Sequence, residues 1–518
     1  MEKVRILWVD DEIDLLKPHI LFLEQKGYNV DISNNGAEGL ELVKSNEYDI
    51  VFLDEQMPGL SGIETLEQMK EEYPNLPIVM ITKSEEETIM EEAIGSNISD
   101  YLIKPVNPNQ ILLSLKKTLE NKKLVSEKTT SQYQQAFNRL GQKISGRLDH
   151  EEWTDVYRRL VRWEVDLEKS NDDGIKEILN MQKLEANQVF GKFIERNYYD
   201  WINGKTNDIP LLSHTLFKEK LFPKLNGNNR PVFLILIDNL RYDQWKVIQP
   251  VIEDNYRTVS DNIFFSILPT VTQYARNAMF SGLMPAEIEK KYPQYWTGEN
   301  DEGTKNQFEK PLLEEYLKRY GKNVKFSYTK VLNLNVGKKL VENLPNMMGN
   351  SLNVIVYNFV DMLSHARTEM EMIRELADDE AAYRSLTSSW FEHSPLKDVI
   401  EYIGEKGADL IITTDHGSVK VSDPVKVLGD RNTNTNLRYK TGRALQYDRK
   451  QVYEVRDPND IYLPKQNISS SYIFCKKYDF FAYPNNYNYY VNYYKDTFQH
   501  GGISMEEVMI PYIELKAK

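Results

Sequence analysis

The sequence contains little cysteine, little histidine and no long apolar run. Its only cysteine, Cys475, cannot form an internal disulfide, and one cysteine in 518 residues suits a reducing compartment. The longest apolar runs, such as residues 232–237, are far shorter than the ~20 residues of a membrane helix, so we expect no membrane span. Acidic residues at positions 2, 10 and 11 precede any apolar segment of a signal peptide. We therefore expect a cytoplasmic protein.

Positive charge is also in deficit, with 64 Lys and Arg against 78 Asp and Glu and a net charge of −14. An acidic chain is a poor generic binder of DNA or membrane surfaces, although a local basic patch is compatible with it. The apolar share of 41% and charged share of 27% exclude collagen-like, low-complexity and wholly disordered chains. A chain of 518 residues exceeds one hydrophobic core, so we expect about three domains.

The pattern of apolar residues changes twice along the chain. Residues 1–122 alternate five short apolar runs with helical segments, which predicts a doubly wound five-stranded α/β domain. Residues 123–205 show helical spacing only, as in Trp153, Val156 and Leu160, which predicts an all-α segment. That segment is either a transmission or dimerisation element or a packed spacer. Alternation of strand and helix returns over residues 206–518 and predicts a second α/β domain.

Polar side chains end the strands of the first domain. The positions are Asp10, Asp11, Asp54, Thr82 and Lys104. Three converging carboxylates form an oxygen-only site suited to Mg²⁺, and a carboxylate held against the ion can attack a phosphoryl group. A hydroxyl and an ammonium can then hold the new phosphate oxygens, and a cis bond before Pro105 would aim the lysine inward. The alternative is that these acids are helix N-caps and solvated strand ends.

These residues resemble the receiver domain of two-component response regulators. The stretch Leu53 to Gly59 matches the phosphoacceptor loop of that family, with Asp54 as the acceptor. The resemblance implies a sensor histidine kinase as partner. It also implies Mg²⁺ ligands and switch residues at the matching positions, which are Asp10, Asp11, Asp54 and the Gln56 carbonyl for the ion and Thr82, Lys104 and Tyr101 for the switch.

Aspartate and histidine follow three apolar runs of the second α/β domain. The candidates are Asp238, Asp361, His365, Asp415 and His416, with His500 near the end of the chain. Asp361 and His365 share one face if their segment is helical. Asp and His ligands together suit Zn²⁺, although a single Asp-His pair is more often a cap or a turn.

A hydroxyl-bearing loop, Pro269 to Thr272, lies between the first two of these strands and opens into a helix. The N-terminus of a helix stabilises an anion and a metal can ionise a hydroxyl, so Thr270 and Thr272 are both candidate nucleophiles. Two Zn²⁺ would contribute +4 and the three aspartates −3. A threonine alkoxide then brings the site to zero, so that it can accept an anionic phosphoester.

This half of the chain resembles the alkaline phosphatase superfamily, most closely its PglZ branch. The resemblance implies two zinc ions, one held by Asp361, His365 and His500 and the other by Asp238, Asp415 and His416 together with Thr272. The nucleophile of that family stands ten residues before a helix-closing glycine. Gly282 is that glycine here, so the spacing selects Thr272 over Thr270.

Together, the three parts resemble PorX-type response regulators, which implies a link to type IX secretion and hydrolysis of small or cyclic oligonucleotides. Our hypothesis is a zinc phosphodiesterase controlled by phosphorylation of Asp54, which drives homodimerisation. Thr272 attacks phosphorus, and Arg276 or Asn277 holds a non-bridging oxygen. The alternative is a non-catalytic, zinc-stabilised scaffold that binds a transcription or secretion partner, but a scaffold has no need of Thr272.

Two further segments have alternative interpretations. The tyrosines between positions 478 and 494 either stack on nucleotide bases or pack within strands and hairpins. The Arg and Lys residues between positions 431 and 450 either guide phosphates into the site or form a solvated loop.

Overall fold

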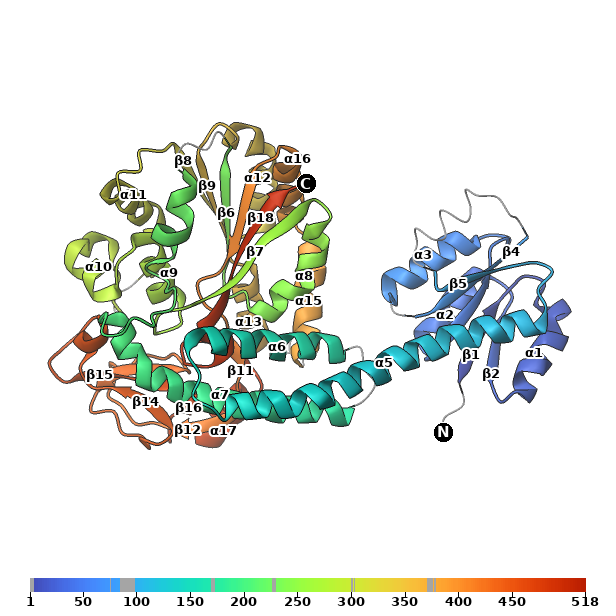
Figure 1. Ribbon diagram of the computed structural model, residues 1–518, viewed down its shortest axis with the longest axis horizontal. Helices are drawn as coiled ribbons and strands as arrows, with labels where there is room; N and C mark the ends of the chain where they lie inside the picture. The colour runs from blue at the N-terminus through green and yellow to red at the C-terminus, as the bar shows by residue number, and fades with distance from the viewer. Residues whose placement is uncertain are drawn as a thin grey trace. The chain divides into compact units, whose positions relative to one another are not determined.

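The computed structural model divides the chain into two compact units, Met1–Gln132 and Tyr133–Lys518 (Figure 1). It describes residues 4–74, 76–83, 98–168, 173–225, 230–299, 301, 303–369, 376 and 379–518. Within these ranges the side chains of residues 116–117, 119–131, 173 and 365–369 are not described. Each unit has its own sheet and is treated separately below.

The first unit contains a parallel five-stranded sheet in the order β2-β1-β3-β4-β5. The strands are β1 (Arg5–Val9), β2 (Asn29–Ser33), β3 (Ile50–Asp54), β4 (Ile78–Thr82) and β5 (Asp100–Ile103). The described helices before β5 are η1 (Ile13–Leu16), α1 (Lys17–Gln25), α2 (Gly36–Ser45) and α3 (Gly62–Glu72). Leu7 and Val9 point into one core and Ile6 and Trp8 into another, so both faces of the sheet are covered. The doubly wound fold is confirmed.

Three helices form the middle of the chain: α5 (Pro108–Ile144), α6 (His150–Glu168) and α7 (Asp173–Ile202). Residues Tyr133, Leu140 and Ile144 of α5 share one core with α6, α7 and the C-terminal sheet. The Trp153 ring lies 5.3 Å from that of Phe190, and the Trp201 ring lies 5.6 Å from that of Phe265. The apolar faces that indicated helices are therefore packed against the C-terminal region.

The second unit is built on a six-stranded mixed sheet in the order β7-β18-β10-β6-β9-β8. Its strands are β6 (Val232–Ile237), β7 (Tyr256–Phe265), β8 (Phe326–Val331), β9 (Leu352–Tyr357), β10 (Asp409–Thr413) and β18 (Met509–Ala517). The four strands β10, β6, β9 and β8 are mutually parallel, whereas β18 and β7 are antiparallel to their neighbours. The carboxyl ends of β6, β9 and β10 therefore meet at one edge of the sheet.

Helices cover both sides of this sheet: α9, α10 and α11 lie on one side, and α8, α15 and α16 on the other (Figure 1). Their bounds are α8 (Tyr242–Glu253), α9 (Thr272–Ser281), α10 (Pro285–Lys291), α11 (Glu309–Arg319), α15 (Glu380–Glu392) and α16 (Pro395–Glu405). Two more helices are α12 (Leu334–Met347) and α13 (Phe359–Glu369). Three short helical elements are η2 (Phe217–Leu221), η3 (Phe222–Leu225) and η4 (Pro293–Tyr295).

Smaller sheets and short helices make up much of residues 419–508. The strands are β11 (Val419–Lys420), β12 (Asp423–Lys426), β13 (Tyr439–Arg443), β14 (Val452–Val455), β15 (Ser470–Cys475), β16 (Asp479–Ala482) and β17 (Phe498–Gln499). The helices are η5 (Pro458–Ile461), α17 (Tyr487–Tyr494) and α18 (Met505–Val508). Residues 487–494 of the tyrosine-rich segment thus form a helix, so the alternative of packing within strands and hairpins is wrong for these tyrosines.

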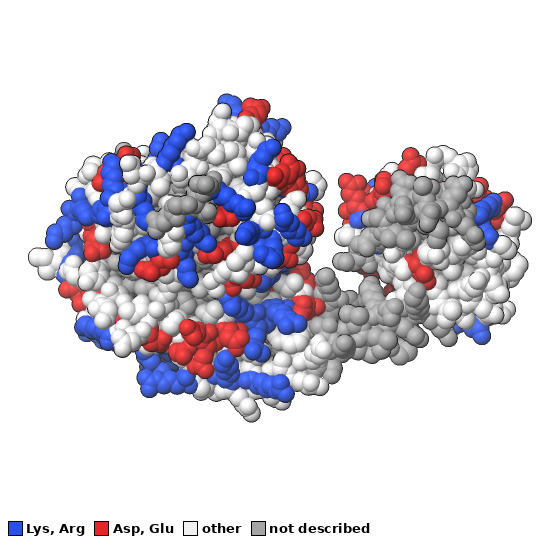
Figure 2. Space-filling model, turned by 45° about the horizontal axis from the view of Figure 1, so that its top comes forward, with Lys and Arg blue, Asp and Glu red and all other residues white. Residues whose placement is uncertain are grey.

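On the face drawn in Figure 2, acidic and basic side chains are interspersed over the larger unit. The basic residues between 431 and 450 do not form one solvated loop, because Arg438 and Lys440 are buried. Arg438 pairs with Glu507, and Lys440 donates to the Asn434 carbonyl oxygen over 2.9 Å. Among the described residues, no helix is both long enough and apolar enough to cross a bilayer.

Candidate functional site

The first candidate site lies at the carboxyl edge of the five-stranded sheet. Asp10 follows β1 and Asp54 ends β3, its neighbour, so parallel pairing brings the two carboxylates together. Oxygens of Asp10, Asp11 and Asp54 lie within 4.8 Å of one another. The first and last are buried, while Asp11 is exposed to solvent. Three carboxylates with one open side are a donor set that fits Mg²⁺, which binds few carboxylates and retains waters.

Lys104 contacts both buried carboxylates. Its Nζ lies 2.9 Å from Asp10 Oδ2 and 2.8 Å from Asp54 Oδ1, and its bond to Pro105 is cis. Burial raises the pKa of Asp54 to about 6, although its hydrogen bond with Lys104 acts in the opposite direction. A carboxyl group with a raised pKa is ionised more readily when a cation binds beside it, which agrees with the Mg²⁺ donor set.

The other predicted receiver residues lie around this edge. Thr82 ends β4 and is buried, next to the strand that contains Asp54. Tyr101 lies in the edge strand β5 and its side chain is exposed. Gln56 lies in the exposed loop after β3. The structure therefore places Thr82 and Gln56 at the carboxyl end of the sheet, whereas Tyr101 is paired with Met80 inside the edge strand and has its ring at the surface.

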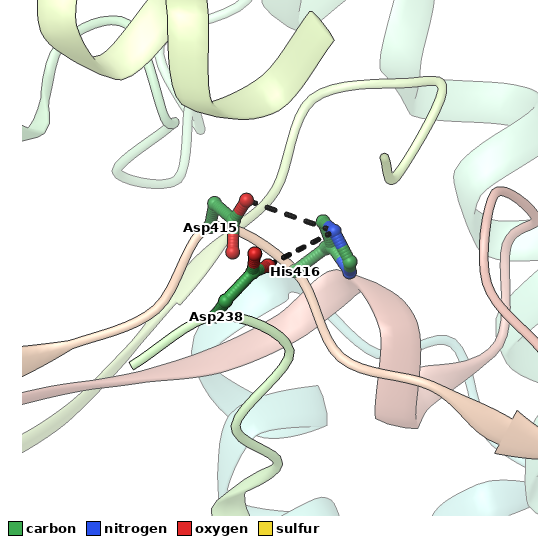
Figure 3. A group of neighbouring side chains, drawn as sticks. All are labelled: Asp238, Asp415 and His416. Atoms are coloured by element: carbon green, nitrogen blue, oxygen red, sulfur yellow. Dashed lines mark ion pairs between the residues drawn. The ribbon is translucent and has the colours of Figure 1, made fainter. Parts of the chain in front are cut away.

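The second candidate site lies at the carboxyl edge of the larger sheet. Asp238 follows β6, and Asp415 and His416 follow β10, its parallel neighbour. Their side chains point toward one another (Figure 3). His416 Nε2 lies 3.8 Å from Asp238 Oδ1 and 3.6 Å from Asp415 Oδ2, and all three residues are buried.

This donor set fits zinc. Tetrahedral zinc with bonds of about 2.0–2.2 Å holds its ligand atoms roughly 3.3–3.6 Å apart, close to the spacing of these three side chains. Burial raises the pKa of Asp238 well above its usual range, with Arg276 opposing this effect. Burial acts in the same direction on Asp415, but Arg276 and His416 outweigh it and lower the pKa of that carboxyl. A bound divalent cation would favour the ionised form of both carboxylates.

The two candidate nucleophiles face different surroundings. Thr272 is the first residue of α9, and its Oγ1 lies 3.1 Å from His416 Nε2 and 3.5 Å from Asp238 Oδ1. Thr270 is fully buried, donates to the Gly502 carbonyl oxygen over 2.9 Å and accepts from the Gly501 amide over 3.1 Å. Only Thr272 of these two has its hydroxyl among the candidate ligands.

Gly282 ends the helix that begins at Thr272. Its φ of 62° is left-handed, and a Cβ there would lie 2.1 Å from Cζ of Tyr316. Glycine suits this position for both reasons, because only a residue without a side chain fits the space and adopts the angle readily. The glycine used in the spacing argument is therefore the C-cap of the helix that places Thr272.

A second pair of candidate ligands lies beside the first group. His500 Nε2 is 3.7 Å from Asp361 Oδ1, and the His500 ring stacks on that of His416 with 4.3 Å between centroids. Asp361 lies in the first turn of α13. The side chain of His365 lies outside the described residues, although its backbone belongs to the same helix. An Asp-His pair next to the first set is chemically suited to a second zinc.

Arg276 and Asn277 do not occupy the places predicted for them. Arg276 is fully buried; it donates to Asp415 Oδ2 over 3.0 Å and to Glu309 Oε1 over 3.2 Å and pairs with Asp238. The Asn277 amide donates to the Gln273 carbonyl oxygen over 2.8 Å. Because these protein groups already occupy both side chains, neither is placed to hold a substrate oxygen. Arg276 instead neutralises two of the candidate ligands, a role that sequence reasoning missed.

A pocket of about 490 Å³ opens beside His500. Its lining includes Asn434, Asn436, Tyr493 and Tyr494. Tyr494 also packs against the core that contains Val419, so this ring has a structural role as well. The pocket gives the second site an approach lined by aromatic and amide groups.

Three family models match consecutive parts of the chain. The response regulator receiver domain matches residues 6–116, and the PorX response regulator linker domain matches residues 123–202. The BREX system PglZ alkaline phosphatase-like domain matches residues 216–515, more than half of the chain. The chain belongs to the PorX-type response regulators with a PglZ domain. The PglZ domain includes Asp238, Asp361, Asp415, His416 and His500, and the receiver domain includes Asp54.

The receiver domain also matches individual proteins. Transcriptional regulatory protein ZraR of Klebsiella oxytoca is 34% identical over 140 residues, 27% of this chain and 32% of that protein. Transcriptional regulatory protein ResD of Bacillus subtilis (strain 168) is 33% identical over 117 residues, 23% of this chain and 48% of that protein. The chain thus spans between about a third and a half of these curated relatives. Among solved structures, a CheY-like receiver domain protein from Methanospirillum hungatei JF-1 is 28% identical, with a TM-score of 0.23, over 23% of this chain and 96% of that one.

Proposed function

We propose that this response regulator is a zinc-dependent phosphodiesterase whose activity is controlled by phosphorylation at Asp54. The observation that carries the proposal is the position of the Thr272 hydroxyl, 3.1 Å from His416 Nε2 and at the edge of the group formed by Asp238, Asp415 and His416. A buried acid and histidine cluster alone would suit a structural metal. The Thr272 hydroxyl adds a nucleophile to this cluster, and the N-terminus of the helix stabilises the negative charge of its ionised form.

Different residues of the chain have different roles in the proposed reaction. The donors of Asp238, Asp415 and His416 would hold one zinc, and those of Asp361, His500 and His365 the other. Bound zinc lowers the pKa of a neighbouring hydroxyl and polarises a phosphoryl oxygen. Thr272 Oγ1, having lost its proton to solvent, attacks phosphorus from the N-terminal end of α9, and the ester oxygen leaves on the opposite side of phosphorus and takes up a proton. Water then cleaves the bond between phosphorus and Thr272 Oγ1, which releases the phosphate product and restores the hydroxyl.

Arg276 sets the charge of the site. Its guanidinium is fully buried and pairs with Asp238 and Asp415. Glu309, also buried, pairs with both Arg276 and Lys330. These three side chains together add one positive charge to the neutral sum of two zinc ions, three aspartates and one alkoxide, so an anionic phosphoester can still bind.

Small or cyclic oligonucleotides are the substrate class that we propose. The pocket beside His500 has tyrosine rings and side-chain amides in its lining. Aromatic rings stack on bases irrespective of sequence, and amides can hydrogen-bond with base edges. Its position next to a candidate metal ligand would place the base near the phosphodiester that is cleaved.

The receiver domain is the part of the chain that we propose controls the phosphodiesterase activity. A sensor histidine kinase is the proposed phosphodonor, and the proposed biological output is regulation of type IX secretion. Phosphorylation at Asp54 is proposed to drive homodimerisation, since a symmetric patch on a receiver closes into a dimer.

The experiment combines elemental analysis with hydrolysis of bis(p-nitrophenyl) phosphate by the full chain. We expect about two zinc ions per chain and zinc-dependent release of p-nitrophenolate. Zinc binding without hydrolysis, in both the unphosphorylated and the beryllofluoride-treated chain, would instead favour a zinc-stabilised scaffold that binds a transcription or secretion partner.

A further inference from the structure

A series of buried ion pairs connects α6 with the loop that follows Asp238. Arg384, on α15, donates to Glu164 Oε1 of α6 over 2.8 Å and to Asp243 Oδ2 of α8 over 3.0 Å. Asp243 Oδ1 in turn accepts from Arg241 Nε over 2.9 Å. None of these four side chains is more than 10% exposed.

This cluster is not a further metal site, although Glu164, Asp243 and Glu380 bring their oxygens within 4.8 Å of one another. Arg241 pairs with two of these three acids, and Arg384 pairs with Glu164 and Asp243. The cations therefore already occupy the space between the carboxylates. The ion pairs instead join α6 to the segments that contain the candidate zinc ligands.

Arg241, at the end of this series, contacts three segments that contain candidate ligands. It lies three residues after Asp238 in the same loop. Its Cγ would lie 3.4 Å from a Cβ on Gly417, the residue after His416, so the absence of a side chain there permits close packing. Its guanidinium carbon lies 5.2 Å from the centre of the Phe498 ring, two residues before His500.

Tyr383 extends these contacts to the fourth ligand segment. Its ring stacks on Phe498 with 4.0 Å between centroids, and Arg241 lies 5.6 Å from its centre. The Tyr383 hydroxyl donates to the carbonyl oxygen of Val360 over 3.3 Å, next to Asp361. The side chains of Arg241 and Tyr383 thus contact all four segments that contain the Asp and His candidate ligands.

We propose that Arg384 and Arg241 are positioning residues for the metal site, through which the position of α6 determines the geometry of the zinc ligands. The inference rests on the proposed function for its catalytic consequence. Charged hydrogen bonds are short and directional. A displacement of Glu164 would therefore also displace Arg384, Asp243 and then Arg241. Groups behind the ligands tune metal affinity and activity without touching the metal.

The test uses the full chain with Arg384→Gln, which removes the central charge and touches no candidate ligand. Three quantities are measured: zinc affinity by chelator competition, the visible absorption of the Co²⁺-substituted chain, and kcat and KM for bis(p-nitrophenyl) phosphate. We expect zinc affinity and kcat to fall about tenfold or more and the Co²⁺ bands to change shape. We expect KM to stay within about twofold, because no substrate contact is removed.

Two variants separate positioning from general loss of stability. Lys224→Gln removes a partly buried pair with Glu514 on β18, outside this series, and should leave the Co²⁺ spectrum and kcat unchanged. Arg384→Lys keeps the charge and should recover part of both. If Arg384→Gln does not fold, the double variant Glu164→Gln/Arg384→Met removes one charge of each sign and keeps the net charge of the cluster. Lys183, which also pairs with Glu164, then retains Glu506, and Asp243 retains Arg241.

An unaltered Co²⁺ spectrum and zinc affinity in a folded variant that lacks Arg384 would overturn the inference. Equal changes in Lys224→Gln would overturn it as well, because the effect would then be general. Absence of diester hydrolysis by the wild-type chain would refute the proposed function alone, since zinc affinity and the Co²⁺ spectrum still decide whether Arg384 positions the ligands.

Discussion

Thr272 Oγ1 lies 3.1 Å from Nε2 of His416, although the two residues are 144 positions apart in the chain. The contact depends on the sheet, because His416 follows β10 while Thr272 begins a helix that covers the same sheet. Thr270, only two residues earlier, is instead hydrogen-bonded to the loop after His500. We therefore expect replacement of Thr272 to abolish catalysis and replacement of Thr270 to lower mainly the stability.

Replacing Thr270 should affect stability more than catalysis. Thr270→Val keeps the shape but leaves the Gly501 amide without its buried acceptor, so we expect a loss of about 1–3 kcal/mol in the free energy of unfolding. Below the melting temperature, kcat should stay near the wild-type value, because Thr270 does not reach the candidate ligands. Thermal unfolding and diester hydrolysis, measured on the same preparation, check both parts. A catalytically dead but stable Thr270→Val variant would contradict the assignment of the nucleophile.

The two candidate zinc sites should be separable by mutation. His500→Ala removes a ligand of the second pair and leaves Asp238, Asp415 and His416 in place, so zinc content should fall from about two ions per chain to about one. Asp415→Asn should remove the other ion. Elemental analysis after dialysis without chelator gives the counts, and two ions retained in both variants would place zinc elsewhere.

Zinc affinity should also fall as the pH is lowered. Imidazole binds a metal only in its neutral form, so protons compete with zinc for the histidine ligands. Chelator competition at a series of pH values measures this effect. A zinc affinity that does not change between pH 7.5 and pH 5.5 would argue against histidine ligation.

Asp54 should make the receiver less stable as the pH rises. Its folded pKa of about 6 lies above its usual 3.8, so the folded state binds more protons than the unfolded state between these values. The free energy of unfolding then falls as the pH increases through this window. Asp54→Asn should therefore stabilise the receiver at pH 7.5 without Mg²⁺, by about 1–2 kcal/mol after allowance for solvent screening at the open side of the site.

Hydrogen exchange of receiver peptides in the full chain, with chelator present, measures this difference. The advantage of Asp54→Asn should vanish at pH 4 and shrink when Mg²⁺ is added, because the ion compensates the buried charge. A variant that is less stable than the wild type at pH 7.5 in chelator would reverse the predicted sign.

Beryllofluoride with Mg²⁺ should convert monomer to dimer by mimicking the acyl phosphate at Asp54. A modification shifts an equilibrium only through its different interactions with the two states, so Asp54→Ala, which cannot hold the mimic, should remain unchanged. Sedimentation velocity distinguishes the two masses. The same mass with and without the mimic would refute the dimer switch and leave the zinc-site argument untouched.

The sequence predicted the strands and their polar ends well, because buried strands require continuous apolar runs. Asp238 and Asp415 each follow such a run in the larger sheet, and parallel pairing brings their carboxylates together. Asp54 ends such a run in the five-stranded sheet, where parallel pairing brings its carboxylate to that of Asp10. The role of Arg276 could not be predicted, because its partners Glu309 and Asp415 are 33 and 139 positions away. No local pattern encodes such a long-range ion pair.

The tyrosine-rich segment shows a different limit. Tyrosine favours strands, so its density suggested strands and hairpins. In α17 the rings instead stack at a spacing of four residues: Tyr489 on Tyr493 and Tyr490 on Tyr494. Packing between neighbouring turns of a helix outweighs the intrinsic preference of the residue here.

The most direct test of the central claim is the rate of bis(p-nitrophenyl) phosphate hydrolysis by zinc-loaded Thr272→Val. Valine keeps the volume and β-branching but has no hydroxyl to attack phosphorus. We predict a fall in kcat of at least ~10³-fold, as expected for loss of a covalent nucleophile, with zinc content and melting temperature largely retained. A Thr272→Val chain that hydrolyses the diester at the wild-type rate would contradict the account.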